Sequence, residues 1–234
     1  MLASVPAAGQ DARGQGVSAP VDIFHGSQSG QETRDALDGG GNPFASALIE
    51  ALRQPRLSLA DLSGLIEKLT SAKSEGLQQA DVPSSIATPG WQVVPPAAGE
   101  SRVALVVVVA DYSVAQANSL PGAARDADRV ATALRQAGFA TTKLVDADRT
   151  AIRLALSKFA ADSAAAGSAV IYTTGHGVEY DGRVHLLMGD YPLQEGSDGL
   201  AEHALRLSEI AAAARARTAN LVFYGGCRNN PFAR

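Results

Sequence analysis

The sequence predicts an α/β protein whose central sheet is mostly parallel and flanked by helices. The first observation is Val103–Ala110, a continuous valine-rich run of the kind found in strands buried on both faces. The second is that, after this run, strand-like segments alternate with segments whose apolar residues recur at helical spacing. The third is size, because 234 residues suffice for one large α/β domain with a substantial core.

The N-terminal part is expected to contain one strand, two helices and two irregular segments. Asn42 and Pro43 have the residue types of an N-cap and a first helical position, and Ser58 can cap the second helix. The expected segments are a flexible tail at 1–19, a strand at Val21–Phe24, a loop at 26–41, helices at about 42–52 and 58–72, and a Pro- and Gly-rich linker at 88–100.

The C-terminal part has the more regular alternation. Gly138 has the residue type that ends a helix, and Asp148 and Ser208 have the type that begins one. The expected strands are Val103–Ala110, Thr141–Val145, Ala169–Thr174 and Asn220–Tyr224, and the expected helices are Asp126–Ala137, one following Asp148 and a short one following Ser208. The stretch between the last two strands is expected to be rich in loops.

Composition and charge exclude several classes of function. Apolar residues make up 46% of the chain and charged residues 19%, as in ordinary globular proteins. The net charge of −4 offers no footprint for a nucleic acid and no electrostatic anchor for a membrane. No apolar run reaches the roughly 20 residues that span a bilayer. The first 15 residues lack the pattern of a signal peptide, so a cytoplasmic location is expected.

Cys227 is the single cysteine of the chain. An internal disulfide is therefore impossible, and a lone cysteine with histidines elsewhere is a candidate nucleophile. The alternative interpretation is a buried cysteine that acts as a small apolar residue.

A histidine partner follows another predicted strand. His176 comes just after Ala169–Thr174, and Cys227 just after Asn220–Tyr224. Ligands of open α/β sheets bind at the carboxyl ends of the strands, so both side chains are expected at one edge. An imidazole there can take the thiol proton and later protonate a leaving amine. The backbone N–H groups of Gly177 and Cys227 are candidate oxyanion donors.

Three segments resemble the caspase-like peptidases of bacteria, the group that includes orthocaspases and metacaspases. They are the Gly-His-Gly around His176, the Cys-Arg-Asn-Asn-Pro-Phe from Cys227, and the loop-to-helix sequence from Leu120 to Asp128. The resemblance covers residues 102–232. It implies a three-layer sandwich and a cysteine peptidase in which Cys227 and His176 form the catalytic dyad.

The small-subunit region of such peptidases normally follows the cysteine, whereas here the chain ends at Arg234. Residues 21–85 resemble that region instead. The resemblance thus implies a circular permutation: a tail at 1–19, a small-subunit-like region at 20–87, a linker at 88–100 and a large-subunit-like catalytic region at 101–234, together forming one domain.

The resemblance also implies a substrate pocket that grips Arg or Lys before the cleaved bond. Asp126 matches one acidic position of that pocket, and Thr174 matches a position where Ser is common. Gly225 replaces the usual Asp two residues before the cysteine, which removes one expected negative charge. The alternative role for Asp126 is a helix N-cap.

The segment from Val21 to Ser27 resembles the strand that lies beside the substrate. Phe24, His25, Gly26 and Ser27 are therefore candidate substrate-binding residues, although His25 can equally be a packed or exposed histidine. His185 and His203 are expected to be structural.

No organic cofactor is expected, and no zinc-type Cys/His spacing, P-loop or dinucleotide-binding glycine motif is present. The resemblance allows calcium, but the carboxylates of Asp181, Asp190 and Asp198 match no compact calcium loop and are expected to be solvated. The expected partner is a polypeptide substrate, with self-processing at exposed arginines such as Arg13 or Arg34. Two alternatives remain: a non-catalytic caspase-like binding module, and a different Cys-His hydrolase or transferase.

Overall fold

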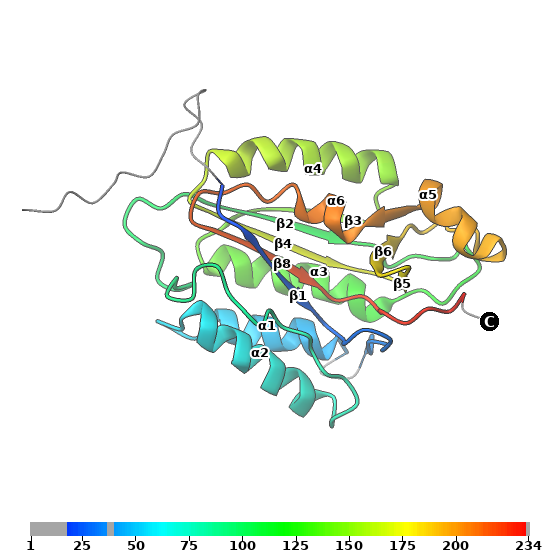
Figure 1. Ribbon diagram of the computed structural model, residues 1–234, viewed down its shortest axis with the longest axis horizontal. Helices are drawn as coiled ribbons and strands as arrows, with labels where there is room; N and C mark the ends of the chain where they lie inside the picture. The colour runs from blue at the N-terminus through cyan, green and yellow to red at the C-terminus, as the bar shows by residue number, and fades with distance from the viewer. Residues whose placement is uncertain (1–17, 37–39, 233–234) are drawn as a thin grey trace, which may run out of the picture.

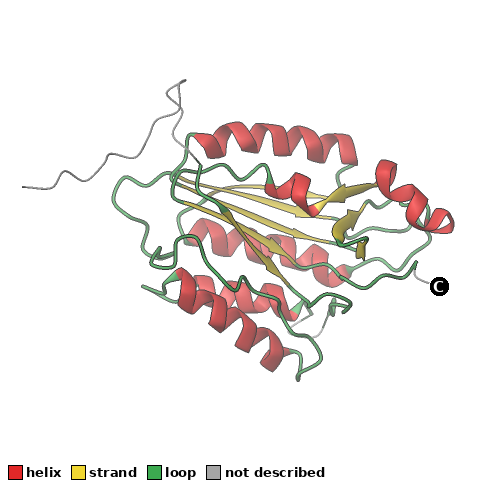
Figure 2. Cartoon of the chain, in the orientation of Figure 1, coloured by secondary structure: helices red, strands yellow, loops and turns green. Residues whose placement is uncertain are grey.

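The protein is a three-layer α/β sandwich, with helices on both faces of a central sheet (Figure 1). It is known from a computed structural model, which describes residues 18–36 and 40–232. Figure 2 shows the long strands running between the two groups of helices. This arrangement confirms the fold class predicted from the sequence. The predicted tail at 1–17 lies outside the described residues.

Five parallel strands form the central sheet in the order β1-β8-β4-β2-β3. They are β1 (Val21–His25), β2 (Arg102–Val108), β3 (Ala140–Val145), β4 (Ser168–Thr174) and β8 (Ala219–Tyr224). Every residue of β4 and β8 is buried, as expected for strands covered on both faces. β4 and β8 are direct neighbours, with Tyr172 opposite Phe223. The segments that follow them therefore leave the same edge of the sheet side by side.

The two faces of the sheet pack against different helices because side chains alternate along each strand. One face is covered by α1 (Pro43–Leu52), α2 (Leu59–Lys73) and α3 (Pro121–Gln136), and the other by α4 (Arg149–Ala164) and α6 (Leu207–Ala211) (Figure 1). Val106 and Phe223 point to the first group, while Leu105 and Val222 point to the second. These two apolar layers hold the strand ends in fixed positions.

A second, antiparallel sheet was not predicted. It has the order β5-β6-β7, with β5 (Gly177–Tyr180), β6 (Arg183–Leu187) and β7 (Ala204–Arg206). A 3-10 helix (Leu193–Gly199) and α5 (Leu200–His203) lie between β6 and β7 in the chain. The expectation of a loop-rich segment here is wrong, because strands of three to five residues are too short to show a clear period. β5 starts directly after His176, so this sheet forms one wall beside it.

The predicted helix caps are largely confirmed. The side chains of Asn42, Ser58 and Asp148 each accept a backbone N–H in the first turn of their helices. Ser208 was wrongly placed as a cap, because α6 begins at Leu207 and its N-cap is Arg206.

Helix α3 begins five residues earlier than predicted, at Pro121 rather than at Asp126. Its N-cap, Leu120, supplies no side-chain hydrogen bond. The carboxylate of Asp35 takes that role from a distant loop, accepting from Gly122 N and Ala123 N at 2.8 Å each. Asp126 therefore lies inside the helix, and its alternative role as an N-cap is wrong.

The N-terminal segment joins the same sheet as the rest of the chain. β1 pairs in parallel with β8, with Phe24 opposite Phe223, which confirms its predicted place beside the cysteine-bearing strand. Residues 88–100 run back across the body: Leu59 N donates to Trp91 O, and the Arg102 guanidinium donates to Val93 O. No helix of the described part of the chain is long and apolar enough to cross a membrane.

Candidate active site

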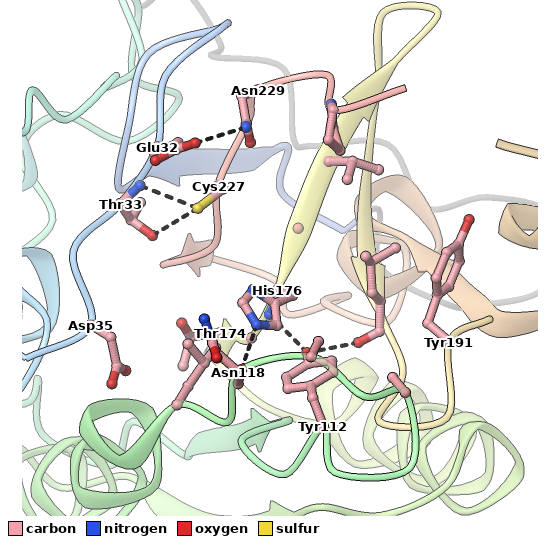
Figure 3. A pocket seen from close by; sticks show the side chains of 18 of the residues that line it. Glu32, Thr33, Asp35, Tyr112, Asn118, Thr174, His176, Tyr191, Cys227 and Asn229 are labelled. Atoms are coloured by element: carbon pink, nitrogen blue, oxygen red, sulfur yellow. Dashed lines mark hydrogen bonds between the residues drawn. The ribbon is translucent and has the colours of Figure 1, made fainter. Parts of the chain in front are cut away.

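His176 and Cys227 lie at the same rim of the central sheet and line one cavity of about 510 Å³ (Figure 3). His176 follows β4 by two residues, and Cys227 follows β8 by three. Because β4 and β8 are hydrogen-bonded neighbours, parallel pairing alone brings the two loops together. Both residues therefore lie at the edge of the sheet where the sequence placed them. Within the described part of the chain, no hydrogen bond joins the two side chains directly.

The imidazole of His176 is held in one tautomer. Its Nε2 lies 2.7 Å from the carbonyl oxygen of Asn118. A backbone carbonyl can only accept a hydrogen bond, so Nε2 carries the proton and Nδ1 is left as the basic nitrogen. Nδ1 is therefore the atom available to take a proton from a thiol in the cavity.

Tyr112 supports His176 from below. The two rings meet edge to face with centroids 4.4 Å apart, and the His176 N–H donates to the Tyr112 hydroxyl oxygen at 2.7 Å. The hydroxyl in turn donates to Leu187 O at 3.0 Å. Burial raises the pKa of Tyr112 far above its ordinary value, so the hydroxyl stays protonated and keeps this donor role.

The positions on either side of His176 must be glycine, because a side chain there would clash with neighbouring atoms of the protein. A Cβ on Gly177 would lie 1.7 Å from the Tyr224 hydroxyl and 2.7 Å from Cys227 O. A Cβ on Gly175 would lie 2.7 Å from the Tyr112 hydroxyl. The two tyrosines thus dock against the histidine loop only because both positions lack a side chain.

Cys227 is partly exposed in the cavity, as a nucleophile must be. Its Sγ accepts a hydrogen bond from Thr33 N at 3.3 Å and lies 3.5 Å from Thr33 Oγ1. The Tyr224 hydroxyl donates to Cys227 O at 3.2 Å and fixes the backbone below the thiol. A residue of the N-terminal segment is therefore the direct neighbour of the sulfur atom (Figure 3). Gly177, the other candidate oxyanion donor, lines the same cavity.

Asp126 lies below the cavity rather than in its lining. Its carboxylate is fully buried, accepts from Asn42 N at 2.7 Å and pairs with the Arg129 guanidinium at 2.7 Å. Burial raises the pKa of Asp126 to about 6, and the hydrogen bond from Asn42 and the charge of Arg129 oppose this rise. Asp126 thus already has two partners of its own.

Thr174 and Gly225 do line the cavity, and they face each other. A Cβ on Gly225 would lie 3.0 Å from Thr174 Oγ1, so this side chain fills part of the space that an Asp would occupy. Two carboxylates that the sequence did not single out lie in the same lining, those of Glu32 and Asp35. The lining contains no Lys or Arg among the residues described, so the cavity is acidic.

The four candidate residues of the β1 segment lie outside this cavity. Phe24 is fully buried and stacks on Phe223, with centroids 4.7 Å apart. Gly26 and Ser27 are also buried; Gly26 N donates to Tyr224 O, and Ser27 Oγ donates to Gln31 O. His25 lines a separate, shallow hollow. Burial and the charge of Arg228 lower the pKa of His25 to about 4, so its ring is neutral at neutral pH.

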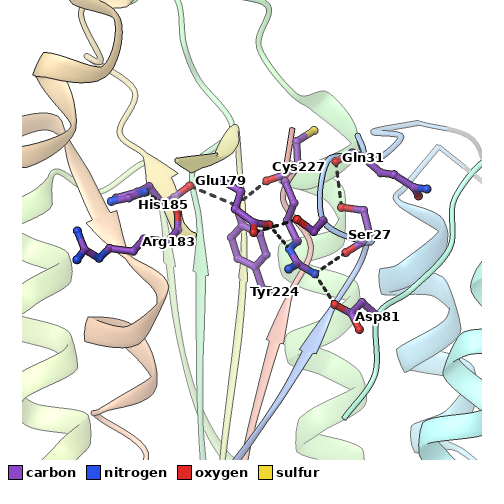
Figure 4. A network of polar contacts seen from close by, with 10 residues as sticks. Ser27, Gln31, Asp81, Glu179, Arg183, His185, Tyr224 and Cys227 are labelled. Atoms are coloured by element: carbon purple, nitrogen blue, oxygen red, sulfur yellow. Dashed lines mark hydrogen bonds and ion pairs between the residues drawn. The ribbon is translucent and has the colours of Figure 1, made fainter. Parts of the chain in front are cut away.

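Arg228, the residue that follows the cysteine, ties three parts of the chain together. Figure 4 shows its partners Glu179, Asp81 and Ser27 near Cys227. Its buried guanidinium donates to Glu179 of β5 at 2.9 Å, to Asp81 at 2.5 Å and to the backbone oxygen of Ser27 at 3.2 Å. Its backbone N–H donates to Gln31 O at 2.8 Å. The loop that carries Thr33 is thereby attached to the loop that carries Cys227.

The sequence did not indicate five further residues of the cavity lining: Glu32, Thr33, Asp35, Tyr112 and Asn118. They lie in loops without periodicity, and only tertiary contacts show that they belong to the cavity.

His203 pairs weakly with Asp190 at 3.6 Å, and Asp181 lies 3.8 Å from Arg183. Among the described residues, no group of three or more His, Cys, Asp or Glu side chains is arranged to hold a metal ion.

Comparison with known proteins gives one family. The family model of the caspase domain matches residues 101–232, more than half of the chain. A search of curated proteins finds no match. The matched region contains both His176 and Cys227 together with four of the five strands of the central sheet. The chain therefore belongs to the caspase-domain family of cysteine peptidases.

Proposed function

We propose that the protein is a cysteine endopeptidase in which Cys227 is the nucleophile, His176 is the acid/base, and cleavage follows an Arg or Lys residue. The observation that carries this proposal is the shared cavity, which is lined by both Cys227 and His176, while the contact of Nε2 with Asn118 leaves Nδ1 as the basic nitrogen. The family supplies the general activity, because caspase domains act on polypeptides.

The proposed reaction follows from the roles of the two side chains. His176 takes the thiol proton on Nδ1, and Sγ attacks the carbonyl carbon of the substrate. The oxyanion is stabilised by the backbone N–H groups of Cys227 and Gly177. Collapse of the tetrahedral intermediate breaks the C–N bond as His176 returns the proton to the leaving amine. Water then hydrolyses the thioester by the same base, which frees the acid product and regenerates the thiol.

The acidic lining supports a basic residue before the cleaved bond. Gly225 leaves no carboxylate at one expected position, but Asp35 and Glu32 enter the cavity from the loop after β1. Asp126 lies outside the lining and its charge is paired with Arg129, so the proposed grip on the basic residue comes from Asp35 and Glu32. A guanidinium in the cavity therefore has carboxylates as neighbours and no competing cation from the residues described.

Residues 20–87 are proposed to be a small-subunit region that precedes the catalytic region by circular permutation. The parallel pairing of β1 with β8 supports this, because the segment completes the sheet next to the cysteine strand. The contact of Thr33 with Cys227 supports it further. Arg34 is exposed next to Thr33 and is one of the described arginines proposed for self-processing.

A second candidate is a non-catalytic module that binds polypeptides. The observation that favours it is the thiol itself, which contacts Thr33 and has no hydrogen bond to His176 in the described part of the chain. In this case the acidic cavity binds a basic peptide without cleaving it.

Labelling of the single cysteine separates the two candidates. An arginine-containing chloromethyl ketone is expected to modify Cys227 in the wild type, as detected by intact-protein mass spectrometry, and to fail in His176→Ala. His203→Ala is the matched control, since that ring lies outside the cavity. A panel of fluorogenic peptides that differ before the cleaved bond, with and without calcium, then measures the preference. The peptidase would be refuted if the label persists in His176→Ala and the wild type cleaves none of the peptides.

A further inference from the structure

The cavity around Cys227 and His176 is chemically divided. Asp35 and Tyr191 lie on opposite sides of His176 (Figure 3). The side with Asp35 is polar and acidic. The wall on the side of Tyr191 is formed by β5, the end of β6 and the segment that follows, and the lining residues from these elements include the apolar side chains of Val178, Leu187, Tyr191 and Leu193.

The apolar side is a built surface rather than a gap between loops. Val178 of β5, Leu187 at the end of β6 and Tyr191 in the turn that follows are almost fully buried. The hydroxyl of Tyr191 donates to Gly196 O, so its polar atom is already satisfied. Leu193 is 44% exposed at the mouth, which leaves a large apolar side chain in water unless something covers it.

The direction of a bound substrate follows from the proposed function, on which this inference rests. The carbonyl carbon must lie at Sγ of Cys227, and the residue before the bond extends toward Asp35. The leaving amine must lie beside His176, because this imidazole protonates it. The residue after the bond therefore passes the imidazole and reaches the apolar side.

We infer that this apolar side is a binding subsite for the residue that follows the cleaved bond, and that it selects leucine, methionine or phenylalanine there. Such a side chain would cover Leu193 and contact Val178 and Leu187. An aspartate or lysine at the same position would be desolvated against apolar atoms with no partner. The preferred substrates thus carry a basic residue followed by a large apolar one.

Internally quenched peptides test this preference directly. The half before the bond is kept constant and ends in Arg, and the next residue is Leu, Phe, Gly, Lys or Asp. Partial burial of a leucine-sized side chain is expected to make kcat/KM for Leu about tenfold higher than for Asp or Lys. An aminocoumarin substrate, which has no amino acid after the bond, serves as the reference for basal activity.

Leu193→Glu is the test variant, and Leu154→Glu is its matched control. Both leucines are exposed, but Leu154 lies on α4 and is 72% exposed away from the cavity. Leu193→Glu is expected to lower the ratio of kcat/KM for Leu peptides to that for Lys peptides by about tenfold. The ratio is taken within one variant, so any change in the basal rate, which the aminocoumarin substrate measures, cancels. Leu154→Glu is expected to leave the ratio and the basal rate unchanged. An unaltered ratio in Leu193→Glu overturns the subsite.

A binding assay keeps the subsite testable apart from catalysis. Because Cys227 is the single cysteine, alkylation by iodoacetamide reports on this thiol alone. Leu-Leu-amide is expected to slow alkylation at least threefold in the wild type and not in Leu193→Glu, whereas Asp-Asp-amide has no effect. Protection in a protein that cleaves no peptide retains the subsite and refutes the proposed peptidase. Equal effects of the two dipeptides, with Arg peptides still cleaved, overturn the subsite and leave the peptidase standing.

Discussion

The hydroxyl of Tyr112 joins the backbone of His176 to the end of β6. It accepts the His176 N–H at 2.7 Å and donates to Leu187 O at 3.0 Å, while its ring packs against the imidazole. The oxygen is buried, so neither partner can turn to water instead. This one oxygen atom thus fixes the position of the His176 backbone relative to the end of β6.

Tyr112→Phe is expected to lower kcat about three- to tenfold with little change in KM. The ring remains, but the His176 N–H and Leu187 O lose their partner, which costs about 1–3 kcal/mol of unfolding free energy. Steady-state kinetics and urea unfolding measure the two effects. Tyr180→Phe, at an exposed tyrosine, is the control. An unchanged kcat would show that the hydroxyl does not position His176.

Asp35→Asn is expected to remove discrimination between Arg and its neutral isostere citrulline. The amide oxygen of Asn can still accept from one of the two backbone N–H groups at the start of α3, those of Gly122 and Ala123, as in an ordinary N-cap. The second bond is lost together with the charge, so urea unfolding is measured alongside to separate the stability cost from the loss of discrimination. The ratio of kcat/KM for Arg to that for citrulline peptides is expected to fall roughly 10- to 100-fold, the value of one charge-assisted hydrogen bond.

Glu32→Gln provides the comparison for Asp35, since Glu32 lies in the same lining but bonds to Asn229 at 3.1 Å. The ratio of kcat/KM for Arg peptides to that for citrulline peptides is expected to fall less in Glu32→Gln than in Asp35→Asn. Equal ratios in the wild type and Asp35→Asn would exclude Asp35 from contact with the basic residue.

The fold was predictable because its signals are local. The apolar runs of β2, β4 and β8 mark buried strands, and a cap residue precedes each of α1, α2 and α4. The start of α3 was misplaced because its cap, Asp35, is 86 residues away from Pro121 in the chain. The β5–β6–β7 sheet was missed because its strands are too short to establish a period.

The candidate site was predictable only where a residue follows a strand. His176 and Cys227 could be paired because parallel strands deliver their ends to one edge. The sequence indicated that the β1 segment lies beside β8, but it did not indicate in which direction the side chains of this segment point. Phe24 points into the helical layer, and His25 lies beside Arg228. Thr33 and Asn118 carry no sequence signal, since a backbone N–H and a carbonyl make the contacts.

Arg228→Met is expected to destabilise the protein by about 3–5 kcal/mol. The methionine keeps much of the side-chain length, but it leaves the half-buried carboxylate of Glu179 without its cation and the Ser27 carbonyl without its donor. Chemical unfolding measures the loss. Arg183→Met is the control, because its pairing with Asp181 is exposed and long at 3.8 Å.

The double variant Arg228→Met, Glu179→Met tests the origin of the effect. If the cost is an uncompensated charge, removal of the second charge is expected to restore part of the stability. A double variant less stable than Arg228→Met would show instead that packing, rather than charge, dominates at this position.

Asp126→Asn is expected to remove a component of stability that changes between about pH 4 and pH 6. Burial raises the pKa of Asp126 to about 6, whereas the unfolded chain has an ordinary value of 3.8. Between these values the native state binds more protons than the unfolded state, so the free energy of unfolding falls as the pH rises. The total change is about 3 kcal/mol or less.

The measurement is urea unfolding of wild type and variant at steps from pH 4 to pH 8. The difference in the free energy of unfolding between wild type and Asp126→Asn is expected to decline from about pH 4 to about pH 6 and then to become constant. Asp128→Asn, at an exposed carboxylate that pairs with Lys143, is the control and is expected to show no such decline. A difference that instead grows with pH would mean that Asp126 gains more from Arg129 and Asn42 as a carboxylate than it loses by burial. The carboxylate would then stay ionised through the whole window, and its ion pair with Arg129 would persist below pH 6.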